Sequence, residues 1–260
     1  MSEAEHVRAR LLADGRVLDV TLSREKGNIL TSSLLAKLDA ALAEHESAPA
    51  LGLVLVRTEG RHFSFGASVE EHRKAQAARM LSSFHAVCRR VAGYPVPIAA
   101  LVQGRCLGGA FELVLAGHFV FAQRSAVFAC PEIKLGVFPP VLAALGPARL
   151  GQSASERLLL TGADLSAPQA AELGLVTELV EDDVELLDAA LGWYQTHIAP
   201  LSAFAVRQAT AAARRSLLRD FSHDLAQAER QYLDELMAGA DPTEGIEAFI
   251  ARRPPAWSHA

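Results

Sequence analysis

The stretch Gly104-Arg-Cys-Leu-Gly-Gly-Ala-Phe-Glu112 decides how this chain folds and where its chemistry lies. It follows an unbroken apolar run at residues 98–102, so it marks the junction of a buried strand with a helix. The Gly108-Gly109 pair permits a sharp turn and leaves room for a ligand beside the backbone. The first amide groups of the following helix have no partner within it and, together with the helix dipole, favour negative charge. The stretch therefore predicts an anion site at a strand-to-helix turn.

Two carboxyl groups flank this predicted site. Glu112 lies three residues after Gly109, on the helix face beside its N-terminus. Twenty residues further on, Glu132 follows Pro131 at the end of a predicted strand. Two carboxyl groups near one anion site can serve as acid and base if their surroundings separate their pKa values. Spacing alone leaves open that Glu112 is incidental and that Glu132 is a solvated loop residue.

Strands and helices alternate through most of the chain, which predicts an α/β fold. Alternation or apolar runs predict strands at residues 16–23, 51–56, 98–102, 119–122 and 126–129, and helical spacing predicts a helix at residues 31–46. The run at residues 51–56 is typical of a strand covered on both faces. Helix starts are predicted at the capping patterns Ser153 to Glu156 and Ser166 to Gln169, with Gly174 ending the second helix. The predicted organisation is a core at residues 1–200 and a helical segment at residues 201–260, divided near Pro200.

Composition narrows the functional class. The chain has 260 residues, of which 50% are hydrophobic, and a formal net charge of −5, which argues against nucleic acid as the main partner. No apolar stretch is long enough to span a bilayer, and the charged start predicts no secretory signal. Cys88, Cys106 and Cys130 lack metal-site spacing. We expect a cytoplasmic protein without a bound metal or a membrane partner.

Several motifs together resemble the enoyl-CoA hydratase (crotonase) superfamily. The resemblance covers nearly the whole chain and rests on five segments: residues 63–69 (Phe-Ser-Phe-Gly-Ala-Ser-Val), residues 98–136 with Leu107-Gly-Gly and Pro131-Glu-Ile-Lys-Leu-Gly, residues 161–170, residues 174–180 and residues 252–257. It implies a spiral of β-β-α turns with a C-terminal helical region used for trimer formation. It also implies a coenzyme A thioester as substrate and no separate cofactor, because coenzyme A is part of that substrate.

The resemblance assigns roles to individual residues. The backbone N–H groups of Ala67 and Gly109 correspond to the donors that hold the thioester oxygen as it becomes enolate-like. Glu112 and Glu132 correspond to the two glutamates of the hydratases, and keeping both favours addition or elimination of water over isomerisation, dehalogenation or thioester hydrolysis. The family assembles as trimers or dimers of trimers, which is the expectation for this chain.

Two departures from the general family pattern narrow the substrate. Ser68 stands where the family usually has Asp after Gly-Ala, and Pro140-Val-Leu-Ala-Ala-Leu145 replaces a Gly-Gly-Thr stretch. Both features are similar to the members that hydrate cyclohexa-1,5-diene-1-carbonyl-CoA to the 6-hydroxycyclohex-1-ene thioester in anaerobic benzoyl-CoA degradation. The side chains expected to border a flat hydrocarbon ring are Phe65, Ser68, Phe138, Val141 and Leu142, and the plain alternative for the last three is that they only pack a helix.

Two alternative functions remain open from the residues. A straight-chain enoyl-CoA hydratase of fatty-acid β-oxidation would use the same glutamates with a different acyl pocket. A non-catalytic RNA-binding relative would need a basic helix face, and no lysine-rich helix is visible. Lys26 and Arg61 are the expected contacts of the coenzyme A phosphates, with Arg252 and Arg253 as further candidates that could equally be surface residues.

Overall fold

The strands of the chain form a six-stranded sheet that carries the rest of the molecule. A computed structural model describes residues 5–260, and of Glu5, Glu25 and Lys26 it describes the backbone alone. The sheet order is β1 (Glu5–Leu12), β2 (Val17–Arg24), β3 (Leu53–Thr58), β4 (Ile98–Val102), β6 (Phe119–Gln123) and β9 (Glu178–Val180). β1 and β2 pair as an antiparallel hairpin, and every other neighbouring pair is parallel. The predicted α/β class is confirmed.

A second, three-stranded sheet lies beside the segment that carries the glutamates. It contains β5 (Arg105–Leu107), β7 (Val127–Ala129) and β8 (Leu165–Ser166). The chain leaves β4 at Gln103-Gly104, enters β5, and turns into helix α4 (Gly109–Ala116). Gly104 has a φ of +57°, a conformation that side chains with a Cβ rarely adopt, so glycine suits this change of sheet. The small sheet thus holds the turn between β5 and α4 in place.

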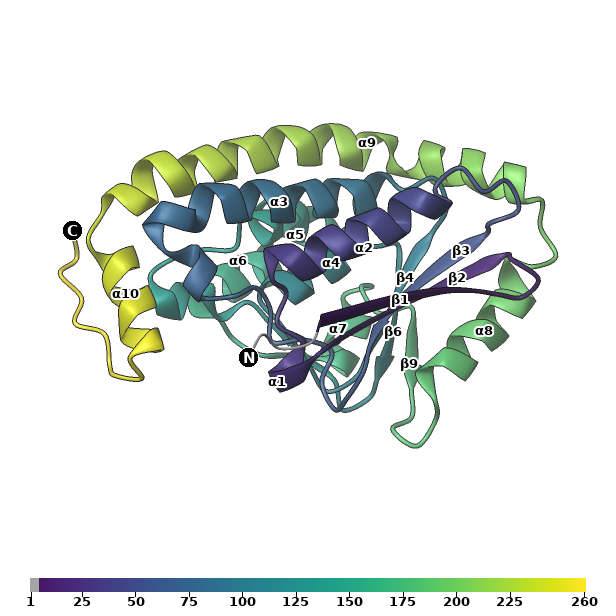
Figure 1. The fold of residues 1–260 in the computed structure, drawn as a ribbon, viewed down its shortest axis with the longest axis horizontal. Helices are drawn as coiled ribbons and strands as arrows, with labels where there is room; N and C mark the ends of the chain where they lie inside the picture. Colours follow the sequence, from purple (N-terminus) through teal and green to yellow (C-terminus); the bar gives the residue numbers. More distant parts are fainter. Residues whose placement is uncertain (1–4) are drawn as a thin grey trace.

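Helices cover both faces of the large sheet. Helices α2 (Ser32–His45), α3 (Lys74–Gly93) and α4 pack on one face, whereas α8 (Leu186–His197) packs on the other (Figure 1). In β3, Val54 and Val56 face the first group of helices, while Leu53 and Leu55 face α8, and all four are buried. The prediction of a strand covered on both faces is therefore confirmed, although β3 begins and ends two residues later than expected.

The part of the chain after Pro139 is mainly helical, as predicted. It contains α5 (Pro140–Leu150), α6 (Gln152–Thr161), α7 (Ala167–Glu172), α9 (Ala203–Arg230) and α10 (Asp241–Ile250), with a π-helical turn at Gln231–Glu235 and a 3-10 turn at Leu236–Ala238. Figure 1 shows α9 running along the length of the molecule above α3, with α10 at the far end. Short helices also occur at α1 (Glu25–Asn28), Glu70–His72 and Pro131–Leu135. Among the described residues, no helix combines the length and apolar character needed to cross a bilayer.

One of the two predicted helix caps is confirmed. The Ser166 side chain accepts a hydrogen bond from the Gln169 amide and Gln169 bonds back, so a capping box opens α7. The cap predicted at Ser153 is wrong, because α6 begins at Gln152 with Gly151 as its N-cap. Gly151 has a φ of +81° and joins α5 directly to α6, which leaves no room for a separate cap. Strand β1 and helix α3 were not predicted.

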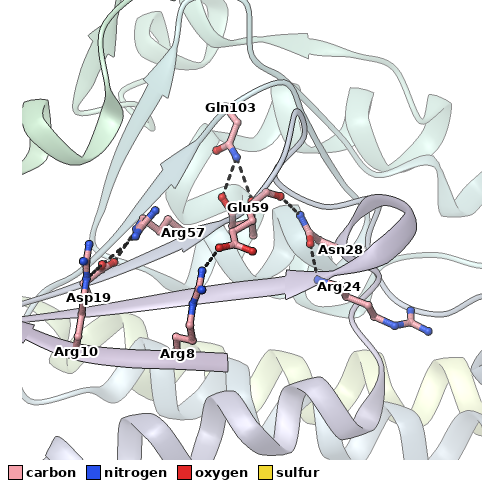
Figure 2. Close-up of polar contacts among 9 residues, drawn as sticks. Arg8, Arg10, Asp19, Arg24, Asn28, Arg57, Glu59 and Gln103 are labelled. Atoms are coloured by element: carbon pink, nitrogen blue, oxygen red, sulfur yellow. Dashed lines mark hydrogen bonds and ion pairs between the residues drawn. The ribbon is translucent and has the colours of Figure 1, made fainter. Parts of the chain in front are cut away.

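A buried carboxylate joins the three strands at one edge of the large sheet. Asp19 on β2 is fully buried, and it accepts a hydrogen bond from Arg10 Nε on β1 at 2.8 Å. Arg57 Nε on β3 donates to the same carboxylate, also at 2.8 Å (Figure 2). Two guanidinium groups thus supply the hydrogen bonds that a buried carboxylate requires.

Candidate active site

The loop that carries Ala67 is held to the end of β2 by Asn28. The Asn28 side-chain amide donates to the Glu59 carbonyl at 2.8 Å, and its side-chain oxygen accepts from the Arg24 amide (Figure 2). The same side-chain amide also donates to the Phe63 carbonyl at 3.2 Å. Asn28 is buried and has a φ of +53°, a conformation that asparagine tolerates better than most residues. This buried asparagine therefore fixes the loop before Ala67.

Ser64 continues this network toward Ala67. Its hydroxyl donates to the Asn28 carbonyl at 2.7 Å and accepts a hydrogen bond from the Gly66 amide at 3.0 Å. The Gly66 carbonyl in turn accepts from the Leu30 amide at 2.8 Å. These bonds use the backbone groups next to Ala67 and leave its own N–H without a backbone acceptor in the described part of the chain.

The loop at Gly66 and the turn before α4 approach each other closely. A Cβ atom on Gly66 would lie 2.6 Å from the Leu107 carbonyl oxygen and 3.3 Å from the Gly109 nitrogen. Gly109 is the first residue of α4, so its N–H has no partner within the helix. The structure thus brings the unused amide groups of Ala67 and Gly109 to neighbouring segments, although they are 42 positions apart in the sequence.

Glu112 is buried and held by the N-terminus of a different helix. Its side chain is 4% exposed, and its Oε1 accepts hydrogen bonds from the amides of Val141 at 2.7 Å and Leu142 at 3.0 Å, both in the first turn of α5. Burial raises the pKa of Glu112 to about 7, and the two amide bonds oppose that rise because they favour the ionised form. Glu112 is therefore poised to exchange a proton near neutral pH.

Glu132 has a more apolar environment than Glu112. It lies in the 3-10 turn Pro131–Leu135 rather than in the predicted loop, and its side chain is 9% exposed. Its Oε2 is buried and has no hydrogen-bond partner among the described residues. Burial, and then the charge of Glu112, raise the pKa of Glu132 to about 8. Both carboxyl groups are thus buried and close enough to interact, which the sequence left open.

Gly108 makes room for the Glu132 carboxyl. Its φ is +53°, and a Cβ atom at this position would lie 2.5 Å from Glu132 Oε1. The Gly108 amide donates to the Ala129 carbonyl at 2.7 Å, which fixes the turn against β7. The predicted sharp turn at the glycine pair is confirmed, and the space beside Gly108 holds the Glu132 side chain. Room for a ligand at this turn stays a prediction.

A cavity of about 660 Å³ opens onto some of these groups, although Gly109 and Glu112 are not among its lining residues. Ala67, Gly108 and Glu132 all line it, so the segment with the expected oxyanion donor and one carboxyl group border the same space. Its remaining wall is mostly apolar and comes from Ile29, Phe65, Val69, Leu107, Leu135 and Phe249, together with polar residues such as Ser68, Glu70, His72, Lys134 and Arg253. A ligand with an apolar part suits such a cavity.

Known proteins share the sequence and fold of this chain. A family model described as enoyl-CoA hydratase/isomerase matches residues 13–260. A cyclohexa-1,5-dienecarbonyl-CoA hydratase of Thauera aromatica is 43% identical over 260 residues, which is 100% of both chains. The chain belongs to the enoyl-CoA hydratase/isomerase family.

Other relatives agree with this placement. A probable enoyl-CoA hydratase of Mycobacterium bovis is 32% identical over 249 residues, covering 95% of this chain and 96% of the relative. The crystal structure of an enoyl-CoA hydratase/isomerase from Xanthobacter autotrophicus matches with a TM-score of 0.83 and 28% identity, covering 95% and 96% of the two chains. The expected crotonase fold is confirmed, and the chain is a hydro-lyase of the enoyl-CoA hydratase type.

Of the five residues expected to border the acyl group in this hydratase, two line the cavity and three do not. Phe65 and Ser68 line the cavity as expected. Val141 and Leu142 do not, because their side chains are fully buried in the main core, and this corrects the expectation for them. These two residues contact the site through their backbone amides, which donate to Glu112. Phe138 also lies off the cavity wall, with its ring packed edge-on against Tyr232 at 5.6 Å between centroids.

The structure does not place either expected coenzyme A contact, Lys26 or Arg61, on the cavity wall. The Arg61 side chain is exposed and is not part of the cavity wall, and the side chain of Lys26 lies outside the described residues. The cations that do line the cavity are Lys134, from the turn carrying Glu132, and Arg253, which pairs with Glu244 at 2.5 Å. Arg253 was among the candidates from sequence, whereas Lys134 was missed although it lies two residues from Glu132.

The sequence reasoning also missed how the hydratase holds Glu112. The amides come from the start of α5, and the proline pair Pro139-Pro140 is the signal that could have located that start, since proline favours the first helical position. The hydrogen bond between the Val141 amide and Glu112 joins residues 29 positions apart, so no local sequence pattern could predict it.

Proposed function

We propose that this protein adds water to a conjugated cyclic dienoyl-CoA thioester, converting cyclohexa-1,5-diene-1-carbonyl-CoA to 6-hydroxycyclohex-1-ene-1-carbonyl-CoA. The observation that carries the reaction is the pair of buried carboxyl groups, Glu112 and Glu132, placed beside two unused backbone amides. A cyclic acyl group as substrate is supported by the full-length similarity to the Thauera aromatica hydratase, whose name includes cyclohexa-1,5-dienecarbonyl-CoA. Anaerobic degradation of benzoyl-CoA is the pathway that this substrate implies.

The proposed role of Ala67 and Gly109 is to stabilise charge on the thioester oxygen. Addition of water to the conjugated system moves negative charge onto that oxygen, and two backbone N–H groups then hold it. Each such donor can contribute about 2.7–4 kcal/mol in the transition state. The arrangement favours the transition state because the amides point where charge develops rather than where it already exists.

The two carboxyl groups divide the proton transfers. Glu112 accepts two amide hydrogen bonds, which favour its ionised form, so it takes a proton from the attacking water. Glu132 lacks any such bond at Oε2, so it remains protonated and delivers its proton to a ring carbon. The oxygen–carbon bond forms as one proton reaches Glu112 and another leaves Glu132, and the coupled pair then exchanges a proton to return to its starting state.

The apolar part of the cavity supports a hydrocarbon ring as the acyl group. Phe65 and Leu135 present apolar surface and make no demand for hydrogen bonds from a ligand. Coenzyme A enters as part of the substrate, with Lys134 and Arg253 as the cavity's cations for its phosphates, and we propose no further cofactor. A cytoplasmic location and a trimer or dimer of trimers belong to the same proposal.

A hydration assay with two thioesters tests the substrate. The purified protein is given cyclohexa-1,5-diene-1-carbonyl-CoA or crotonyl-CoA, and the loss of one C=C bond and the gain of one water are followed by absorbance and by mass. We expect kcat/KM for the cyclic thioester to exceed that for crotonyl-CoA at least about tenfold. The reverse preference would replace the proposal by a straight-chain hydratase. Inactivity on both, with RNA retained on a column at physiological salt, would favour the RNA-binding alternative.

A further inference from the structure

One buried tyrosine near the glutamates has an unexplained hydroxyl group. Tyr232 lies in the π-helical turn Gln231–Glu235, directly after α9, and π-helical turns occur frequently at functional sites. Its side chain is 1% exposed, yet its hydroxyl has no hydrogen-bond partner among the described residues. Buried polar groups normally have a partner, and Tyr94 shows the ordinary case, since its hydroxyl donates to the Leu42 carbonyl at 2.9 Å. The Tyr232 hydroxyl therefore needs a partner from outside the protein chain.

The packing of Tyr232 places it behind the wall of the catalytic cavity. Its ring packs against Phe138 and belongs to a small core cluster with Met80, Val137 and Ile246. Val69 and Leu135 pack on this cluster and also line the cavity. The same cluster therefore supports both the tyrosine ring and one side of the space into which Glu132 faces.

The carboxyl groups act electrostatically on this hydroxyl. Burial, followed by the charges of Glu132 and Glu112, raises the pKa of Tyr232 far above its ordinary value, so the phenol stays protonated and remains a hydrogen-bond donor. Glu132 Oε2 is also buried without a partner, which means that the two groups are not bonded to each other. The turn that carries Glu132 also carries Leu135, which packs on the cluster of Tyr232, so these two unpartnered polar atoms belong to adjoining elements. Such atoms mark a place for a ligand oxygen or a water molecule.

We propose that Tyr232 is a further catalytic residue, whose hydroxyl donates a hydrogen bond to the oxygen of the water that is added and then holds the new hydroxyl group of the product. This inference rests on the proposed hydration reaction. No bond to Tyr232 forms or breaks: the water oxygen bonds to carbon, its proton passes to Glu112, and the proton of Glu132 passes to carbon. Tyr232 keeps its own proton throughout and orients the oxygen between the two carboxyl groups.

The test compares two substitutions that each remove one unpartnered hydroxyl. Tyr232→Phe keeps the ring that packs on Phe138. Tyr194→Phe is the matched control, because the Tyr194 hydroxyl is also buried without a partner in the described part of the chain but lies between the sheet and α8, where Arg16 rather than a glutamate acts on it. Both variants are assayed for hydration, for the reverse dehydration and for thermal unfolding.

We expect Tyr232→Phe to lower kcat for hydration about tenfold and to raise KM for the hydroxylated thioester by about the same factor, while KM for the unsaturated thioester and kcat for dehydration stay within about twofold, so that the equilibrium constant is unchanged. Its Tm should stay equal or rise, because an unsatisfied buried hydroxyl is removed. Tyr194→Phe should leave all kinetic constants within about twofold of the wild-type values. A merely structural Tyr232 hydroxyl would change Tm alone, so kinetics of Tyr232→Phe that match those of Tyr194→Phe would overturn the proposal.

The design also separates this inference from the substrate proposal. The variants are compared on whichever thioester the wild-type enzyme hydrates faster. A wild type that prefers crotonyl-CoA overturns the cyclic substrate. The Tyr232→Phe and Tyr194→Phe variants are then compared with the wild type on crotonyl-CoA by the same kcat and KM values. A wild type that hydrates neither thioester overturns both proposals.

Discussion

At the scale of single residues, the two glutamates differ by what surrounds them rather than by what they are. Both are buried, but Glu112 accepts two amide hydrogen bonds at Oε1, whereas Glu132 has an Oε2 without a partner among the described residues. Amide donors stabilise a carboxylate, whereas apolar burial stabilises the neutral acid. The structure thus supports the order of proton affinity expected from sequence, with Glu132 above Glu112, and supplies α5 as a cause that was not foreseen.

Substitutions that prevent proton transfer by either glutamate test the proposed roles of Glu112 as base and Glu132 as acid. Glu112→Gln and Glu132→Gln keep the shape of the side chain, and the amide oxygen introduced at position 112 can still accept hydrogen bonds from the start of α5. We expect each change to lower kcat about 10²–10⁴-fold with little effect on thioester binding, because the oxyanion donors are backbone groups. Steady-state kinetics and equilibrium binding of the thioester measure the two effects separately. Near-normal hydration by Glu132→Gln would make a one-glutamate reaction such as isomerisation the better explanation.

The raised pKa of Glu132 also predicts a stability change with pH. The pKa is about 8 in the folded chain against an ordinary value of 4.5, so folding favours the protonated form. This contribution to the free energy of unfolding is full below about pH 4.5 and is lost as the pH rises through about 8. Glu132→Gln does not ionise, so its Tm should exceed that of the wild type by several degrees near pH 9 and approach it near pH 5. Thermal unfolding at both pH values measures this, with the exposed Glu172→Gln as a control that should show no such trend.

At the scale of elements, the site depends on loops that distant side chains hold in place. Ser64 links the Asn28 carbonyl to the Gly66 amide, directly before Ala67. A donor amide must lie within a few tenths of an ångström of its productive position to stabilise developing charge. The precision of the Ala67 amide therefore comes from side chains that lie outside the cavity wall.

Ser64→Ala tests this positioning role. The Gly66 amide loses its acceptor, so we expect kcat to fall about tenfold or more while KM changes little, since the donor acts mainly in the transition state. Ser155→Ala is the control, because Ser155 is equally buried and its hydroxyl bonds the Gly151 carbonyl at 2.8 Å in a helix away from the cavity. If both variants lose only Tm and keep kcat, Ser64 has no bearing on the oxyanion donors.

For substitutions of Val141 and Leu142 in the first turn of α5, the structure predicts a loss of stability instead of the loss of substrate preference expected from sequence. Because the side chains of Val141 and Leu142 lie in the core, Val141→Ala and Leu142→Ala should cost about 1–5 kcal/mol of stability through the cavities they leave. The ratio of activities on cyclic and linear thioesters should stay constant, because neither side chain borders the ring. Denaturant unfolding and the two-substrate assay measure these effects, and Leu38→Ala in α2 provides a comparable core deletion. A selective loss on the cyclic thioester would restore the original expectation.

At the scale of the whole molecule, residues 201–260 do more than form a separate helical segment. α9 packs along α3 and α5 (Figure 1), and Gly245, Phe249 and Arg253 line the cavity of the candidate active site. The expected division at Pro200 lies close to the start of α9 at Ala203, but the cavity uses residues from both sides of it. A role of the helical segment in assembly stays a prediction.

The assembly prediction has a direct measurement. Large apolar side chains on α9 and α10 remain exposed, with Phe204 at 71% and Phe249 at 57%, which is surface that a subunit contact would cover. We expect light scattering coupled to gel filtration to give a mass three or six times 27.8 kDa. A stable species of 27.8 kDa at micromolar concentration would contradict this.

Local signals determined much of this protein from sequence alone. The strand at residues 98–102 and the helix that begins at Gly109 follow from neighbouring residues, because apolar runs, glycine pairs and capping patterns act within one or two turns of chain. The types of the site residues were also readable, since Ala67, Gly109, Glu112 and Glu132 carry a family motif. Such features need no knowledge of which segments meet.

Only the tertiary structure decided how those residues work. Whether Val141 faces the ring or the core depends on how α5 packs, because each position along a helix turns the side chain by about 100° and the local sequence does not fix which face meets the core. The pKa values of the glutamates depend on desolvation, which arises when distant segments close over them. Tyr232 stands 100 positions from Glu132 in the chain, and only the packing of its π-helical turn on the cluster that includes Leu135 brings the tyrosine hydroxyl under the influence of that carboxyl group.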